Sequence, residues 1–383
     1  MQTRLLERFL RYVAVTSQSD ASQAVVPSTE GQRSLAELLK KDLDELGLVN
    51  LEISEYSVLT GKLPANLPAG SGEQVPAVGF VAHLDTVDVN LSADIKPQVV
   101  RSYSGGDICL NEKKGIYLRE AEHPELLKYK GQDIVCTDGT SVLGADNKAA
   151  IANVVVALET LVQNKDLQHG DIYVAFVPDE ECGLRGAKKM DFSKFPVAFA
   201  YTIDCCELGE VVYETFNAGS AVVKIKGVSA HPMSAKGVMV NPTLVAVDLI
   251  NSFDRMQTPE HTEGTEGYIW AKSIISNQSE AVVQLDIRDH NKNTYEARKH
   301  LIKTNVESLQ KLYPRAEIVC TITDTYGNIA DAVNDENRKC IDYIYTAMSE
   351  LGIKPNTIAM RGGANLVHSV DSSAKAIDLT NMN

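Results

Sequence analysis

Two adjacent glutamates, Glu180 and Glu181, are the residues whose type and position most directly suggest chemistry. They follow an apolar run that ends in Phe176, Val177 and Pro178. Neighbouring carboxylates repel each other unless a cation or a shared proton lies between them. A metal ion is therefore the first hypothesis. A solvated acidic loop after a strand is the alternative, and the rest of the chain must decide between them.

A second candidate group lies at the end of the segment 78–86, whose apolar residues predict a buried strand. Alternate residues of a strand share a face, so His83 and Asp85 project to the same side. Asp85 can then accept the second ring N–H of His83, directly or through a short turn, and leave the other ring nitrogen for a metal ion. A histidine paired with an acid and no metal is the alternative for this fragment alone.

Two further acids stand where predicted elements begin or end. Asp146 and Asn147 open a helical pattern over 144–161, so either residue is suited to be the helix N-cap. The functional alternative is that Asp146 bridges two cations. Asp204 follows a short apolar strand, 197–203.

One sheet must position these candidates. Apolar runs predict buried strands, and helical spacing predicts covering helices, in these ranges: strands 78–86, 171–178 and 197–203, and helices 5–15 and 32–46. Ligands of open α/β sheets bind at the carboxyl ends of the strands, so the four acidic or histidine-bearing segments are expected to converge there. The turn-rich segments 61–72 and 91–142 are expected to be a connection and an irregular cover over the sheet.

The hydrophobic pattern changes near residue 210. From there, short predicted strands alternate with two amphipathic helices, 242–256 and 294–312. This pattern predicts an inserted, smaller α+β domain with an antiparallel sheet. Its first helix is a candidate surface for packing against a second subunit. We expect a helix at 335–351 and a strand at 357–360 to return to the first domain.

The expected fold is therefore α/β, with a mixed, mostly parallel sheet, helices on both of its faces, and the inserted domain as a lid or dimerisation domain. The expected organisation is a catalytic domain in two parts, 1–208 and 324–383, around an inserted domain at 209–323.

Composition narrows the partners and the compartment. The 383 residues carry a formal net charge of -14, which argues against nucleic acid or an anionic membrane surface as a partner and is compatible with divalent cations. Seven scattered cysteines without a CxxC pair fit a reducing cytoplasm. The sequence has no apolar run of membrane-spanning length and no secretory signal pattern at its start.

With these residues in view, the chain resembles the tripeptide aminopeptidases of the M20 family of dinuclear zinc peptidases. The matching stretches occur in order along the chain and are 82–86, 143–148, 178–181, 201–204, 230–232, 236–242, 263–268, 287–289 and 361–363. The resemblance implies a cytoplasmic enzyme that removes the N-terminal residue from tripeptides with a free N-terminus, holds two Zn²⁺ per subunit and forms a homodimer.

The resemblance also implies a role for each candidate residue in the metal site. His83 and Asp204 would bind one zinc, Glu181 the other, and Asp146 would bridge them. Asp85 would orient His83. Glu180 would be the general base that takes a proton from the attacking water.

The implied substrate contacts come from the later part of the chain. His231, in the smaller domain, would help to hold the oxyanion or the substrate, reaching the active site of the partner subunit in a dimer. Asn241 and Arg288 would contact the substrate. Arg361, with Gly362 and Gly363, would approach the peptide.

The sequence departs from the family pattern after Gly363. There the family continues with Thr-Asp-Gly and later supplies a last zinc-binding histidine, whereas this chain continues with Ala364 and Asn365. His368 is the only later histidine and does not stand in the matching context. We therefore expect a truncated C-terminal part and a second metal held only by Asp146 and Glu181.

Two other functions stay open at this point. One is a catalytically impaired, truncated homologue that keeps the fold but lacks the last zinc-binding histidine. The other is an M20 amidase or deacylase that acts on acylated amino acids. The segments 263–268 and 324–328 match the tripeptidase branch and count against the amidase.

Overall fold

The computed structural model describes residues 2–68, 75–204, 207–335, 337–361 and 375–379. The chain divides into two compact units, which are described separately. Unit 1 comprises Met1–Val211, Lys339–Asn356 and Ala364–Asn383, and unit 2 comprises Val212–Arg338 and Thr357–Gly363.

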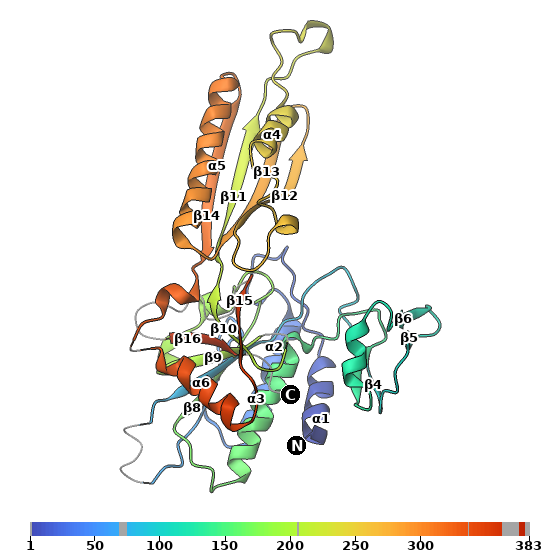
Figure 1. Cartoon of the computed structure of the whole chain (residues 1–383), viewed down its shortest axis with the longest axis vertical. Coiled ribbons are helices and arrows are strands. Elements are labelled where there is room, and N and C mark those ends of the chain that lie inside the picture. The colour runs from blue at the N-terminus through green and yellow to red at the C-terminus, as the bar shows by residue number, and fades with distance from the viewer. Residues whose placement is uncertain (1, 69–74, 205–206, 336, 362–374, 380–383) are drawn as a thin grey trace. The chain divides into compact units, whose positions relative to one another are not determined.

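A mixed sheet forms the centre of unit 1 (Figure 1). Its strands, in spatial order, are β1 (Val49–Ile53), β2 (Leu59–Leu63), β8 (Ile172–Val177), β3 (Val78–His83), β9 (Phe199–Ile203) and β16 (Lys375–Leu379). The pairs β1–β2 and β2–β8 are antiparallel, whereas β8, β3, β9 and β16 run parallel. The carboxyl ends of β3, β8 and β9 therefore meet at one edge. Beyond β16 in the strand order stand β10 (Glu210–Thr215) and β15 (Asn356–Met360), which are neighbours and each contain the boundary between the units.

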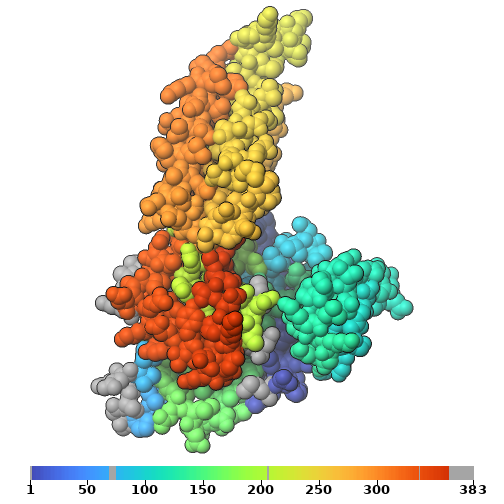
Figure 2. All heavy atoms as spheres, viewed as in Figure 1, coloured from blue at the N-terminus to red at the C-terminus, as the bar shows by residue number. Residues whose placement is uncertain are grey.

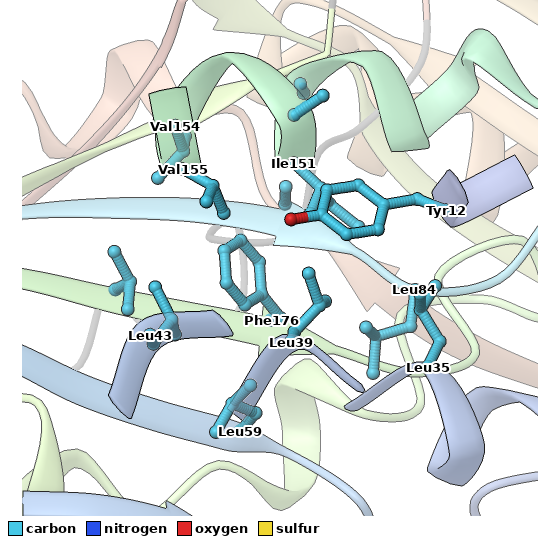
Figure 3. Packing of buried hydrophobic residues seen from close by; sticks show 14 of the residues in the cluster. Tyr12, Leu35, Leu39, Leu43, Leu59, Leu84, Ile151, Val154, Val155 and Phe176 are labelled. Atoms are coloured by element: carbon cyan, nitrogen blue, oxygen red, sulfur yellow. The ribbon is translucent and has the colours of Figure 1, made fainter. Parts of the chain in front are cut away.

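Helices pack on one face of this sheet and form the main core. The helices of unit 1 are α1 (Gln2–Val13), α2 (Glu30–Glu45), α3 (Ala145–Gln163) and α6 (Lys339–Glu350). Figure 3 shows where α2 and α3 meet Phe176 of β8, through Leu39 and Leu43 from α2 and Val155 from α3. All four side chains are fully buried, and removing such apolar area from water is the main stabilising term of the fold.

The opposite face of the sheet carries the alternate strand residues. Val81 of β3 and Val177 of β8 pack there against Phe195. This cover includes two 3-10 helices, η3 (Ala187–Lys189) and η4 (Phe192–Lys194), so helical segments lie on both faces. The predicted α/β fold is confirmed.

A small lobe of unit 1 replaces the irregular cover expected over 91–142 (Figure 2). It holds two two-stranded sheets and a 3-10 helix: β4 (Pro97–Val100) with β7 (Ile134–Thr137), β5 (Ile108–Asn111) with β6 (Ile116–Leu118), and η2 (Pro124–Tyr129). Tyr103, Ile108, Leu126 and Cys136 form its own core. The expectation of irregular structure was wrong because these strands are too short to show periodicity.

Unit 2 contains a four-stranded antiparallel sheet, as expected. The strand order is β12 (Tyr268–Ser276), β13 (Glu280–Asp289), β11 (Asn217–Lys226) and β14 (Glu317–Tyr326). The helices α4 (Pro242–Asn251) and α5 (Lys292–Leu312) pack on it and on each other (Figure 1). Short 3-10 turns complete the unit: η5 (Pro232–Ser234), η6 (Pro259–His261) and η7 (Ile329–Ala332). Across the described residues, none of the helices is long and apolar enough to span a lipid bilayer.

Most boundaries shift by one to three residues from the expectation, and three differences are larger or change the type of element. Residues 61–63 end strand β2 instead of starting a connection, because they pair with β8. Helix α4 ends at Asn251, five residues early, and α6 begins at Lys339, four residues late.

The buried core around α2 generates a prediction about stability. Replacing Leu39 by Ala removes a fully buried side chain and leaves a cavity, so the free energy of unfolding should fall by about 2–5 kcal/mol. Leu167→Ala is the matched control, because Leu167 is 48% exposed and its loss should change stability by less than about 0.5 kcal/mol. Urea unfolding followed by circular dichroism measures both. Equal losses in the two variants would contradict the assigned core.

Candidate metal centre

The predicted ligands converge at the carboxyl edge of the sheet in unit 1. His83 is the last residue of β3, Glu180 and Glu181 follow β8, Asp204 follows β9, and Asp146 lies at the start of α3. Two groups that share His83 each have ligand atoms within 4.8 Å of one another: His83 with Glu180 and Glu181, and His83 with Asp146 and Asp204. These five residues therefore surround one small volume.

The hydrogen bonds of His83 define which of its ring nitrogens faces the acids. Nδ1 lies 3.0 Å from the backbone carbonyl oxygen of Asp85 and 3.4 Å from its carboxylate. A carbonyl oxygen only accepts, so Nδ1 carries the hydrogen. Nε2 faces the carboxylates of Asp146 at 2.7 Å and Asp204 at 3.8 Å. Sequence analysis anticipated that Asp85 fixes this ring, but its backbone oxygen is the nearer acceptor.

The carboxylate of Asp85 has a second function that the sequence did not reveal. It accepts the backbone N–H groups of Glu180, at 3.0 Å, and Glu181, at 3.1 Å. Asp85 is fully buried. Burial alone would raise the pKa of this carboxyl group, but hydrogen bonds from His83 and from the Glu180 backbone bring the pKa below its ordinary value. One side chain thus holds the ring on β3 and the glutamates after β8.

Asn147 is a positioning residue that sequence reasoning missed. Its Oδ1 accepts the backbone N–H of His83 at 3.1 Å, and its Nδ2 donates to the Ile203 carbonyl at 2.6 Å and to Asp204 Oδ1 at 3.0 Å. It thereby ties the ends of β3 and β9 together. The sequence pattern offered Asp146 or Asn147 as a helix cap, which was wrong: the N-cap is Gly144, and the side chains of Asp146 and Asn147 bind His83, Ile203 and Asp204 instead.

The electrostatics of the site favour a cation. Burial and neighbouring carboxylates raise the pKa of Glu180 to about 8 and that of Glu181 to about 7. Burial would lower the pKa of His83, but hydrogen bonds with Asp146, Asp204 and Asp85 raise it well above its ordinary value. The raised pKa values of the two glutamates and of His83 are both consistent with an excess of negative charge in the cluster.

The nearest lysine does not neutralise this charge by contact. Lys148 is fully buried, and its Nζ donates to the carbonyl oxygen of Val15 at 2.7 Å. Burial lowers its pKa to about 7.

The donor set fits divalent metal ions. The lone pair of a neutral His83 would face the Asp146 oxygen at 2.7 Å, which is repulsive unless a proton or a metal ion lies between them. Imidazole nitrogen and carboxylate oxygen are ligands that Zn²⁺ accepts. The Asp146 side chain is 67% exposed, so the centre opens to solvent on that side.

The predicted substrate-binding arginines have backbone partners within unit 2. Arg288 donates to the carbonyl oxygens of Gly219 and Ile287, both at 2.9 Å. Arg361 donates to the carbonyl oxygens of Gly264 and Glu266. Arg361 also donates to Thr262 Oγ1 at 2.7 Å, and so it fastens the 262–266 loop.

The two other predicted contacts cap short elements. Asn241 Oδ1 accepts the Thr243 N–H and caps α4. His231 is exposed, and its Nδ1 accepts the Met233 N–H at 3.2 Å. Gly362, Gly363 and His368, and with them the departure from the family pattern after Gly363, lie outside the described residues.

Comparisons with known proteins place this geometry in a family. Residues 213–317 match the peptidase dimerisation domain of the M20 family. The chain is 52% identical to a peptidase T-like protein of Yersinia pestis over 365 residues, and 40% identical to peptidase T of Caldanaerobacter subterraneus over 363 residues. Each alignment covers 95% of this chain and 87% of the relative.

Solved structures share the fold. A tripeptidase from Staphylococcus aureus superposes with a TM-score of 0.76 at 21% identity, and the aminopeptidase PepT from Bacillus cereus with a TM-score of 0.73 at 20% identity. Each match covers 99% of this chain and 90% of the other.

The double role of Asp85 generates a prediction about metal affinity. Asp85→Asn replaces one accepting oxygen by a donor, so one of the Glu180 and Glu181 amides loses its acceptor, and the side chain beside His83 loses its negative charge. Zinc affinity, measured by competition with a chromophoric chelator, should fall about 10–100-fold. Asp88→Asn changes an exposed acid just after the same strand and should leave the affinity unchanged. Unchanged affinity in Asp85→Asn would contradict the role assigned to Asp85.

Proposed function

Because the chain belongs to the peptidase T family of M20 peptidases, we propose that it is a dinuclear zinc aminopeptidase that removes the N-terminal residue from tripeptides. The observation that carries this proposal is the convergence of His83 and four acids at one edge of the sheet. The name of the relatives, and that of the S. aureus tripeptidase, support the choice of a short peptide as substrate.

The geometry of the site and the family resemblance support a proposed set of metal ligands. His83 and Asp204 would hold one Zn²⁺, Glu181 the other, and Asp146 would contact both. Bound zinc supplies a Lewis acid that polarises the scissile carbonyl and lowers the pKa of a water molecule. The several carboxylates offset the repulsion between two divalent ions.

Glu180 would act as the general base. It stands beside the ligands, and its backbone is held by Asp85. A glutamate that is not needed as a ligand can take a proton from the attacking water and return it to the leaving amine. Asp85 and Asn147 would keep the ring of His83 and the carboxylate of Asp204 in place during this transfer.

Unit 2 would supply substrate contacts and the dimer. We assign the inserted domain at 209–323 to these tasks, because 213–317 match a dimerisation domain. His231, Asn241, Arg288 and Arg361 are the proposed contacts, with exposed His231 reaching the site of the partner subunit. The arginines would bind substrate with N–H groups beyond those that hold backbone carbonyls.

A reducing compartment suits the proposed enzyme. Among the described cysteines, Cys109, Cys136, Cys182 and Cys320 form no disulfide. Disulfides form in oxidising compartments, so this supports a cytoplasmic location.

Metal dependence tests the proposed reaction. The purified protein should release alanine from trialanine, lose this activity after treatment with a chelator, and regain it with Zn²⁺. N-acetyl-trialanine should not be hydrolysed, because its N-terminus is blocked, and dialanine should be a poorer substrate. Amino-acid release is measured by chromatography. Failure to cleave trialanine with two zinc ions bound would refute the proposal, and cleavage of the acetylated peptide would favour an amidase.

The role of Glu180 makes a separate prediction. Glu180→Gln removes the base but no proposed ligand, so kcat for trialanine should fall about 10²–10⁴-fold at unchanged zinc content. Zinc per chain is measured by atomic emission. Glu122→Gln, at an exposed position, is the control and should retain full activity. Loss of zinc in Glu180→Gln would instead make this residue a ligand.

A further inference from the structure

A buried hydrogen-bond cluster adjoins the two glutamates at the preceding residue, Asp179. We propose that Gln32 and Asp179 are a positioning pair that fixes the loop carrying Glu180 and Glu181. The catalytic consequence of this inference rests on the proposed function, whereas its structural consequence does not.

The carboxylate of Asp179 is bound by three donors. Asp179 Oδ2 accepts the backbone N–H of Ser28 at 2.7 Å, and Oδ1 accepts the Ser28 hydroxyl at 2.5 Å and Gln32 Nε2 at 2.7 Å. Both Asp179 and Gln32 are fully buried. Burying a carboxylate costs free energy unless hydrogen-bond donors surround it. Ser28 and Gln32 supply those donors to Asp179.

Gln32 forms hydrogen bonds with both the side chain and the backbone of Asp179. Its Oε1 accepts the Asp179 N–H at 2.8 Å while its Nε2 donates to the carboxylate. This two-point contact sets the orientation of one residue relative to the first turn of α2. Asp179 has a φ of +53°, a conformation that L-residues rarely adopt but that Asp and Asn tolerate best.

Three consecutive amides of the loop are therefore each held by a side chain from another segment. Gln32 takes the N–H of Asp179, and Asp85 takes those of Glu180 and Glu181. With the backbone held from two sides, the two glutamate side chains leave the loop in a defined direction. Such precision is what proton transfer and metal binding require.

A second contact holds the segment before α2, which includes Ser28. Arg185, four residues after Glu181, donates to the carbonyl oxygens of Gln23 at 2.6 Å and Ala21 at 3.1 Å. The loop after β8 and the segment before α2 thus hold each other in place. A change at Asp179 is expected to act on this pair of segments and not on the distant core.

The test is a double-mutant cycle. Its substitutions keep the shape of each side chain and, at position 179, use a residue type that tolerates a positive φ. Asp179→Asn replaces one accepting oxygen by an N–H₂ group, which in either orientation of the amide meets a donor, the Ser28 N–H or the Gln32 N–H₂. Gln32→Glu places a carboxylate against the Asp179 carboxylate. The double variant restores one donor facing one acceptor and the original number of charges. Ser28→Ala removes one of the three hydrogen bonds and replaces Asp179→Asn in the series should that variant not fold.

Asp42→Asn is the matched control for general loss of stability. Asp42 is equally buried in α2 and is bound by Tyr12, Arg8 and Arg11, without contact to the loop. Its substitution should lower the melting temperature and leave kcat unchanged. All variants are assayed well below their melting temperatures, with zinc content measured in parallel.

Two readouts separate this inference from the proposed reaction. Hydrogen exchange in the metal-free protein should become about tenfold faster in peptides covering 178–186 of each single variant, and return toward the wild-type rate in the double variant. For trialanine, kcat should fall about 10–100-fold in each single variant, with KM within about threefold, and recover in the double variant. Asp42→Asn should show neither effect.

The opposite results have distinct meanings. Unchanged exchange in 178–186, or equal acceleration in Asp42→Asn, overturns the positioning pair even when the enzyme is active. Local acceleration with unchanged kcat overturns its catalytic role. A wild-type protein that cleaves no tripeptide refutes the proposed function, while the exchange data still decide whether Gln32 and Asp179 fix the loop.

Discussion

Repulsion among carboxylates crowded at one edge of a sheet is the constraint on which the candidate site depends. Asp146, Glu180, Glu181 and Asp204 surround a single imidazole, and burial together with the neighbouring carboxylates raises the pKa of both Glu180 and Glu181. Such a cluster opposes folding of the metal-free chain, because like charges are brought together. Bound divalent ions would make the electrostatic contribution of this cluster favourable to folding. Metal binding is then coupled to stability, since the folded chain collects donors that lie far apart in the unfolded one.

The sheet brings the donors together, but polar side chains behind the site give them their orientation. Asp85 joins the ends of β3 and β8, and Asn147 joins β3 to β9. Asp179 joins the β8 loop to the segment before α2. Each of these groups is buried and finds hydrogen-bond partners, which is the condition under which buried polar residues specify one arrangement. The ligands are thus held through contacts among loops that a parallel sheet alone would leave free.

Sequence patterns predicted the convergence of the candidate ligands better than the residues that support them. His83 and Asp204 end apolar runs, and the alternation of strand residues and the convergence of parallel strands follow from local rules. The positioning role of Asn147 was not predicted, because a helix cap explains an asparagine at that position equally well. Its three hydrogen-bond partners are also distant in sequence. Strand β2 contains Gly61 and Lys62 and is a strand through its pairing with β8. Strand β12 buries Ile269 but exposes most of its other residues, so it shows no alternation.

The two adjacent glutamates show how environment separates chemically identical side chains. Their backbone amides are both held by the carboxylate of Asp85, so the two side chains start from the same anchor. Burial raises the pKa of Glu180 further than that of Glu181, to about 8 against about 7. Glu180 lies deeper beside the histidine than Glu181, so the same pair of residue types meets two different environments. Under the proposed function, this difference in environment is what distinguishes the base from the ligand.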